Sequence, residues 1–208
     1  VGAKPVFVDI DKRTYNMDPS DVERKITPKT RAIIVVHQIG LPAELSALTN
    51  TANKNGLFLI EDAACALGAE YHGKRVGTFG DIACFSFHPR KSITTGEGGL
   101  LTTKNFKLAQ KLKSLRSHGV VKTTTGEHYP YLGYNYRMTD IQAAIGLEQL
   151  TKLGAILKHR QVLAGRYDRA LKKIPGITTP YVPQRMTHTY QSYMICVGRR
   201  DQLAAHLR

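Results

Sequence analysis

The stretch RAIIVVHQIGLPAELSALTNTANKNGLFLIED, from Arg31 to Asp62, decides the fold. The β-branched apolar run over residues 32–36 predicts a strand buried on both faces, as in a parallel sheet. Pro42 then suits a first helical turn, apolar residues follow at helical spacing, and Gly56 stands where a helix would end. Residues 57–60 predict a second buried strand. The stretch is therefore a βαβ unit with a right-handed crossover, and the fold class is α/β.

Regular elements continue on the carboxyl side of this unit. Residues 82–87 and 99–103 predict strands, and residues 106–115 predict a helix. The segment 122–136, rich in Thr, Gly and Tyr, is too long for an ordinary connection, so we expect it to be functional or mobile. Thr139 and Gln142 form a capping-box pattern, which opens a helical pattern that continues with interruptions to about residue 173.

Two proline-containing breaks, at residues 175–176 and 180–183, predict a domain boundary. We expect a large domain over residues 1–175 and the beginning of a small α+β domain over residues 176–208, with its first strand at 193–197. The chain starts without Met, and its last residues follow a helical pattern that stops midway. We therefore expect that parts of a longer protein are absent at both ends.

Composition limits the class of protein. The chain has 208 residues, of which 42% are hydrophobic, enough to bury one sizeable core. Its apolar runs are too short for a membrane helix, and its start lacks a signal-peptide pattern. The three cysteines are widely spaced with no CxxC pair, so we expect no disulfide framework and no metal site, in a cytoplasmic protein.

The formal net charge of +14 is concentrated in two stretches, 104–122 and 152–173. This charge would suit nucleic acid or an acidic metabolite such as a nucleotide diphosphate. The alternative is a pair of solvated helix faces, which we favour. Because no aromatic side chains alternate with the basic residues, we expect no nucleic-acid partner.

Three features of the predicted sheet edge suggest chemistry. Asp62 ends a buried strand at the edge where ligands of open α/β sheets bind, although it could equally cap a helix or form an ion pair. The sequence SFHPRK, residues 86–91, delivers Lys91 onto a loop after a strand, and Ser86 is either a phosphate ligand or an ordinary strand-end hydroxyl. The glycines of GEGG, residues 96–99, indicate a backbone that turns sharply or packs closely. A lone lysine after a strand is usually just solvated, and the glycines alone do not indicate a function.

Together these features lie in EDAACALGAEYHGKRVGTFGDIACFSFHPRKSITTGEGGLLTT, residues 61–103. This segment resembles the central part of the DegT/DnrJ/StrS family of nucleotide-sugar aminotransferases. VGAKPVFVDID, VVHQIGLPAEL and LGYNYRMTDIQAAIGLEQL are similar to other parts of the same family. The resemblance covers nearly the whole chain. It implies the aspartate-aminotransferase-like fold (fold type I), with a mainly parallel central sheet in the large domain and a smaller C-terminal domain.

The resemblance also implies roles for individual residues. Lys91 matches the lysine that holds pyridoxal 5'-phosphate (PLP) as a Schiff base. Asp62 matches the aspartate that pairs with the pyridine nitrogen, and Ser86 matches a serine that binds the cofactor phosphate. Asn135 matches an asparagine that reaches the partner subunit's cofactor. The roles implied for the remaining two positions are weaker: Arg137 faces the substrate, and Cys65 stands where the family commonly has a glutamine near the ring oxygen. Cysteine is a weak donor, so a packing role for Cys65 is equally compatible.

The implied activity is transfer of an amino group from an amino acid, usually L-glutamate, to a nucleotide-linked keto-sugar. The implied assembly is a homodimer with shared active sites. Related sugar dehydrases have a histidine in place of the lysine, so Lys91 favours transamination. A third interpretation is a non-catalytic regulatory protein on the same scaffold, which the joint presence of Asp62, Ser86 and Lys91 disfavours. We also expect residues 1–208 alone to bind PLP poorly.

Overall fold

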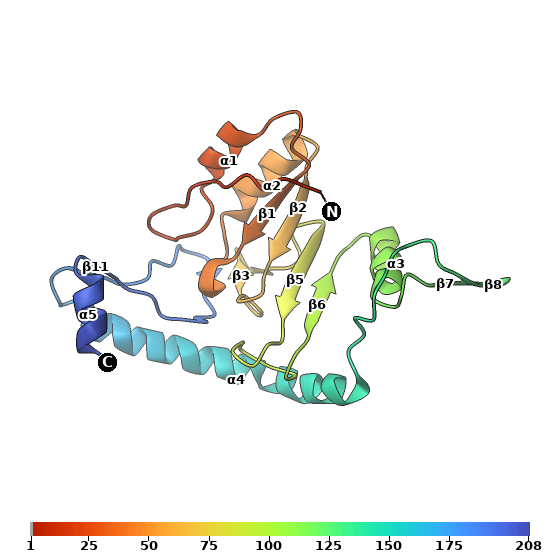
Figure 1. Ribbon diagram of the computed structural model, residues 1–208. Helices are drawn as coiled ribbons and strands as arrows, with labels where there is room; N and C mark the ends of the chain where they lie inside the picture. The colour runs from red at the N-terminus through yellow and green to blue at the C-terminus, as the bar shows by residue number, and fades with distance from the viewer. Residues whose placement is uncertain (1) are drawn as a thin grey trace.

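The computed structural model describes residues 2–208, and its centre is a four-stranded mixed sheet (Figure 1). The strands are β1 (Ala32–Val36), β2 (Phe58–Asp62), β5 (Ile82–Ser86) and β6 (Gly99–Thr102), in the order β1-β2-β5-β6. β1, β2 and β5 are parallel, whereas β6 is antiparallel to β5. The α/β class and the mainly parallel sheet are thus confirmed, together with the strands predicted on either side of Lys91.

One face of this sheet is packed and the other is open. Helix α1 (Pro19–Lys25) and helix α2 (Leu45–Lys54) contribute side chains to the same buried cluster as the inward residues of β1, β2 and β5. On the opposite face Ile34 is 58% exposed and Phe58 63% exposed. The prediction that the first strand is buried on both faces was therefore wrong for the described residues, since both helices lie on one side.

The long helix α4 (Asp140–Leu171) runs beneath the carboxyl ends of β1, β2 and β5 (Figure 1). Its predicted capping box is confirmed: Thr139 accepts from the backbone of Gln142, and the Gln142 side chain accepts from the backbone of Thr139. The predicted interruptions were wrong, because α4 is one continuous helix of 32 residues. Each internal glycine weakens a helix by only about 1 kcal/mol, which the cap and the many regular turns can absorb.

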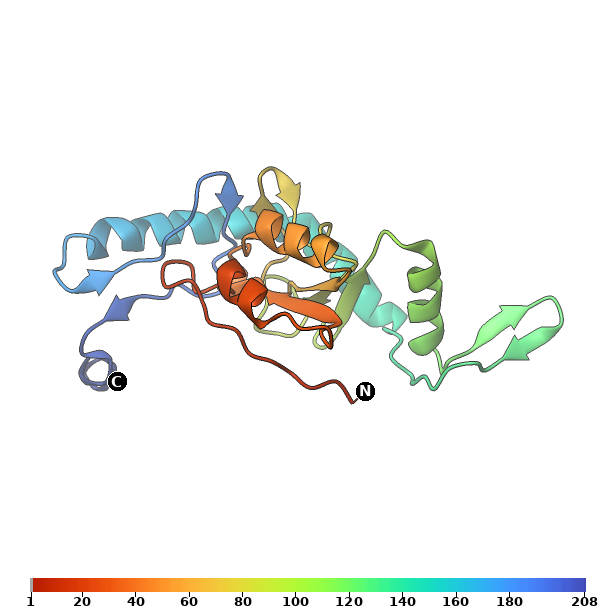
Figure 2. The same cartoon turned by 90° about the horizontal axis from the view of Figure 1, so that it is seen from above.

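The region between β6 and α4 projects from one end of the molecule (Figure 2). Helix α3 (Phe106–Leu115) confirms the predicted helix, and the next residues form a hairpin of β7 (Val121–Thr123) and β8 (Gly126–His128). The segment 122–136 thus contains regular structure, which accounts for its length. Whether it is functional remains a prediction.

The residues after 175 fold back against the rest of the chain. β10 (Met186–Thr187) pairs with β3 (Glu70–Tyr71), and β3 also pairs with β4 (Lys74–Arg75). The strand expected at 193–197 is shorter than predicted: β11 (Cys196–Val197) pairs with β9 (Ile177–Thr178), and α5 (Arg200–His206) follows. The domain boundary near residue 175 remains a prediction. None of the helices within residues 2–208 has both the length and the apolar character needed to cross a membrane.

Candidate functional site

The candidate site lies where β2 and β5 end. In the parallel register Asp62 is the partner of Cys84, and Ser86 lies two residues further along β5. Side chains two residues apart on a strand point to the same face. Asp62, Cys84 and Ser86 therefore share the open face of the sheet, at the edge where ligands of parallel sheets bind.

Asp62 carries a carboxylate with few protein partners. It is half-buried, and its Oδ1 accepts from the backbone N–H of Ala64 at 3.1 Å. Within residues 2–208 no basic side chain forms an ion pair with it. Two effects raise the pKa of the Cys84 thiol: burial, which is the larger, and the nearby negative charge of Asp62. Asp62 therefore offers a negative charge to a cationic group on this face, which a protonated pyridine nitrogen would satisfy.

A turn after β5 carries Lys91 back to the sheet edge. The Oγ of Ser86 accepts from the N–H of His88 at 3.3 Å, and the N–H of Lys91 donates to the carbonyl of His88 at 2.9 Å. The N–H of Arg90 donates to His88 Nδ1 at 3.1 Å. Residues 88–91 therefore close a compact turn instead of extending the strand, which is consistent with Pro89 ending the ladder.

Lys91 and Cys65 are brought into contact by this turn. The Nζ of Lys91 donates to the Sγ of Cys65 at 3.2 Å, although the two residues are 26 positions apart in the chain. Cys65 lies three residues beyond the end of β2, and both side chains are half-buried. The ε-amine is thus directed toward the strand-end region that holds Asp62.

The GEGG segment packs as closely as its glycines predict. A Cβ on Gly98 would lie 2.6 Å from the Oγ1 of Thr95 and 2.8 Å from the methyl carbon of Met138. The carbonyl of Glu97 accepts from the side chains of Thr95 and of Gln142 on α4. The glycines allow the loop after Lys91 to lie directly against the start of α4, which fixes one border of the site.

Asn135 and Arg137 lie apart from this group. Both are exposed, and Asn135 pairs with Ser117 in an isolated β-bridge next to α3. Among the described residues, no hydrogen bond joins either side chain to the residues around Lys91. One chain alone therefore places Asp62, Ser86 and the Lys91–Cys65 pair at or just beyond the ends of β2 and β5, and leaves Asn135 and Arg137 on its surface.

The segment 189–191, which no sequence pattern predicted as part of the site, borders it. The Oγ1 of Thr189 donates to the carbonyl of Cys65 at 2.8 Å, and the side-chain amide of Gln191 donates to the carbonyl of Arg90. The N–H groups of Thr189 and Gln191 donate to the carbonyls of Gly40 and Ile39, both at 3.0 Å. These contacts span more than 100 positions of sequence, so no local pattern could have indicated them.

The residue before Asp62 belongs to the packed face. Glu61 and His37 are fully buried, and His37 Nε2 lies 3.0 Å from Glu61 Oε2. The N–H groups of Gly77, Phe79 and Gly80 donate to the same carboxylate at 2.7 to 2.9 Å. Burial opposes ionisation of Glu61, but the hydrogen bonds from His37, Gly80 and Gly77 outweigh it and hold its pKa below the ordinary value.

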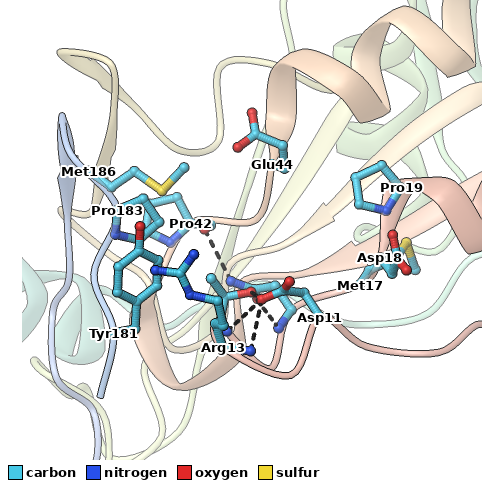
Figure 3. Close-up of a pocket in the computed structure, with 12 residues that line it drawn as sticks. Asp11, Arg13, Met17, Asp18, Pro19, Pro42, Glu44, Tyr181, Pro183 and Met186 are labelled. Atoms are coloured by element: carbon cyan, nitrogen blue, oxygen red, sulfur yellow. Dashed lines mark hydrogen bonds between the residues drawn. The ribbon is translucent and has the colours of Figure 1, made fainter. Parts of the chain in front are cut away.

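A hollow of about 200 Å³ lies elsewhere on the molecule. It lies between the loop around residues 11–19, the start of α2 and residues 181–186, and the guanidinium of Arg13 stacks on the ring of Tyr181 at 3.7 Å from its centroid (Figure 3). None of the six predicted site residues lines it. The candidate site is instead an open region at the sheet edge.

In residues 2–208 no cluster of three or more His, Cys, Asp or Glu side chains could hold a metal ion.

Comparison with known proteins identifies the protein family to which this fold belongs. The family model of the DegT/DnrJ/EryC1/StrS aminotransferase family matches residues 1–208. GDP-perosamine synthase of Caulobacter vibrioides is 42% identical over 212 residues, which cover 99% of this chain and 57% of that enzyme. UDP-N-acetyl-3-dehydro-alpha-D-glucosamine 3-aminotransferase of Acidithiobacillus ferrooxidans is 41% identical over 208 residues, covering 100% of this chain and 55% of that enzyme.

A solved structure agrees with these sequence relatives. The crystal structure of DesV from S. venezuelae, in complex with a ketimine intermediate, superposes with a TM-score of 0.93 and 36% sequence identity. The match covers 99% of this chain and 55% of DesV. The fold is that of a sugar-aminotransferase scaffold. This chain belongs to the DegT/DnrJ/EryC1/StrS aminotransferase family, and it spans about half the length of the relatives that it matches.

Proposed function

We propose that the protein is a PLP-dependent aminotransferase that moves an amino group from L-glutamate to the keto group of a nucleotide-linked sugar. The observation that carries the proposal is the 3.2 Å contact of Lys91 Nζ with Cys65, which directs a primary amine to the strand ends beside Asp62. Family membership and the names of the two sugar-nucleotide relatives support the substrate class.

The residues at the sheet edge fit PLP. The cofactor carries an aldehyde, a ring nitrogen that works best when protonated, and a phosphate. Lys91 offers a primary amine, and Asp62 offers a carboxylate that is in no ion pair within residues 2–208. Ser86 offers a hydroxyl on the same face of the sheet. This set of donors and acceptors matches the three polar groups of the cofactor.

Each residue then has a distinct task. When bound, PLP supplies an electron sink for the carbanion formed on the substrate carbon. Lys91 would hold the cofactor through its aldehyde, and its amine, when free, would move a proton as a general base and then a general acid. Asp62 would keep the ring nitrogen protonated by charge. Ser86 would donate a hydrogen bond to the phosphate.

The proposal includes a homodimer whose subunits share their active sites. In such a dimer Asn135 would reach the partner's cofactor and Arg137 would face the substrate, the roles that the family resemblance implies, and both residues are exposed in the single chain. Large apolar side chains near these two residues in the sequence are exposed: Leu132 is 86% exposed, Ile141 76% and Leu147 69%. Large exposed apolar patches are typical of interaction surfaces. Sedimentation velocity should show a dimer, and a Leu147→Asp substitution should shift it toward the monomer.

We also propose a reducing compartment, the cytoplasm, for this enzyme. Cys65, Cys84 and Cys196 are all free thiols. Cysteines stay reduced in the cytoplasm, whereas secreted proteins usually pair them.

The activity can be tested on the full-length protein, which is the form used in every PLP experiment below, with PLP, L-glutamate and a panel of GDP- and UDP-linked keto-sugars. We expect 2-oxoglutarate to form at a rate that depends on the keto-sugar, with the ping-pong kinetics of a shuttled amino group. Lys91→Ala should lower the rate by at least about 1,000-fold, the upper range for losing a general acid–base residue. Lys74→Ala, on exposed β4, is the matched control and should keep the wild-type rate. A Lys91→Ala variant with wild-type turnover would contradict the proposal.

A further inference from the structure

The contact between Lys91 and Cys65 is held from both sides by side chains of the segment 189–191, which bind backbone carbonyls next to it. The carbonyl of Cys65 accepts from Thr189, and the carbonyl of Arg90, the residue before Lys91, accepts from Gln191. Thr189 and Gln191, two residues of one short segment, thus hold both the backbone that carries the thiol and the backbone that carries the amine.

That segment is itself anchored. The guanidinium of Arg160, on α4, donates to the carbonyl of Tyr190 at 3.1 Å and to the side-chain oxygen of Gln191 at 3.3 Å. The backbone N–H groups of Thr189 and Gln191 donate to the loop at Ile39 and Gly40. The sulfur–nitrogen contact therefore rests on a network of fixed groups.

We propose that Cys65 is a positioning residue for Lys91. Its sulfur accepts a hydrogen bond from the ε-amine and holds that amine at the strand ends, so that the amine meets an incoming aldehyde in one orientation. Lysine has four rotatable side-chain bonds, and a hydrogen-bond acceptor at its tip reduces the number of conformations that compete with the reactive one. The inference rests on the proposed function, because it assigns Cys65 a part in forming the bond between Lys91 and PLP.

The contact itself can be tested without PLP. The probe ortho-phthalaldehyde condenses with a primary amine and an adjacent thiol: nitrogen bonds to both aldehyde carbons, sulfur bonds to one, and two water molecules leave. We expect peptide mapping to show a fluorescent isoindole that joins Cys65 to Lys91. Cys65→Ser and Lys91→Ala should each abolish it, and Cys196→Ser, at an exposed thiol, should leave it unchanged. Failure to form this cross-link in the wild-type protein would overturn the proposal.

The positioning role is tested by the rate at which PLP bonds to Lys91, followed by visible absorption. Cys65→Val has a similar size but accepts no hydrogen bond, so we expect it to slow this step by about 5- to 10-fold, the value of one hydrogen bond. Cys65→Ser keeps an acceptor and should remain within about two-fold of wild type. Circular dichroism should show that both variants fold.

The two hypotheses fail in different ways. If the wild-type protein forms no bond between PLP and Lys91, the proposed function and the positioning role are both wrong. If the bond forms equally fast in wild type and Cys65→Val, only the positioning role is wrong, and the aminotransferase proposal stands.

Discussion

Glu61 and Asp62 are neighbours in the sequence, yet they lie in opposite environments. Glu61 points into the packed face, is fully buried, and receives hydrogen bonds from His37 and from three backbone N–H groups. Asp62 points to the open face and receives one backbone hydrogen bond. Alternation along one strand thus separates a carboxylate that stabilises the fold from one that remains available to a ligand. The number of hydrogen-bond partners, more than the residue type, indicates which carboxylate has which role.

The largest expected effect comes from removing the buried carboxylate. Glu61→Ala would leave His37 and the N–H groups of Gly77, Phe79 and Gly80 without their acceptor. Breaking a buried pair costs about 3–5 kcal/mol, so chemical denaturation should show a loss of this size in the free energy of unfolding. The lowered pKa of Glu61 means that its contribution is present above about pH 4.3, the ordinary value, and is lost as pH falls. A loss below about 1 kcal/mol would show that the pair is not structural.

The complementary change is Asp62→Asn. We expect turnover to fall about 100- to 1,000-fold, the usual cost of removing one electrostatic partner of the reacting group. Stability should change by less than about 1 kcal/mol, because the asparagine Oδ1 can still accept from Ala64. Assays of turnover and thermal unfolding on the same sample separate the two quantities. If Asp62→Asn kept wild-type turnover, or lost much stability, Asp62 would not differ from Glu61 in the way proposed here.

A pH effect should arise from His188, whose Nδ1 accepts from the N–H of Tyr190 and whose ring stacks on that tyrosine. Burial lowers the pKa of His188 to about 4. The unfolded chain, with an ordinary pKa near 6.5, binds the proton first, so stability is complete above about pH 6.5 and declines toward pH 4. The shift corresponds to about 3 kcal/mol at most. Denaturation at pH 7.5 and pH 5 should show about 2 kcal/mol of this loss, because pH 5 lies about 1.5 pH units below the unfolded pKa, and His188→Gln should reduce it.

The smallest expected effect concerns Cys84, the strand partner of Asp62. Burial and the nearby carboxylate raise the pKa of this thiol, and only the thiolate reacts with alkylating reagents. At neutral pH iodoacetamide should therefore label Cys84 more slowly than the exposed Cys196, as mass spectrometry can measure. Asp62→Asn should speed labelling of Cys84 by a few-fold at most, as expected for a charge on a solvated face. Faster labelling of Cys84 than of Cys196 would contradict the described environment of Asp62.

Much of this arrangement could be predicted from local sequence. The apolar runs that form β1 and β2, the capping box of Thr139 and the close packing of Gly98 follow from residue types at fixed spacing, and each is confirmed. The open face of β1 could not be predicted, because a β-branched run does not reveal what covers it. Glu61 within an apolar strand was a readable signal of a buried polar pair, although nothing in the sequence named His37 as its partner.

The unpredicted parts of the site depend on distant contacts. Cys65 was expected near the cofactor ring from family resemblance, but its contact with Lys91 requires the turn after β5 to bend back. Thr189 and Gln191 approach Cys65 and Arg90 only because the chain after α4 returns across the loop at Gly40. Such contacts depend on tertiary packing, which periodicity and spacing do not encode.

The central claim is that Lys91 is the residue that bonds to PLP. The direct measurement is to incubate the protein with PLP, reduce it with borohydride, digest it, and locate the attached pyridoxyl group by mass spectrometry. We expect one modified position, Lys91, with the surface lysines of α3 unmodified and the label absent from Lys91→Ala. A pyridoxyl group on another lysine, with Lys91 free, would contradict it.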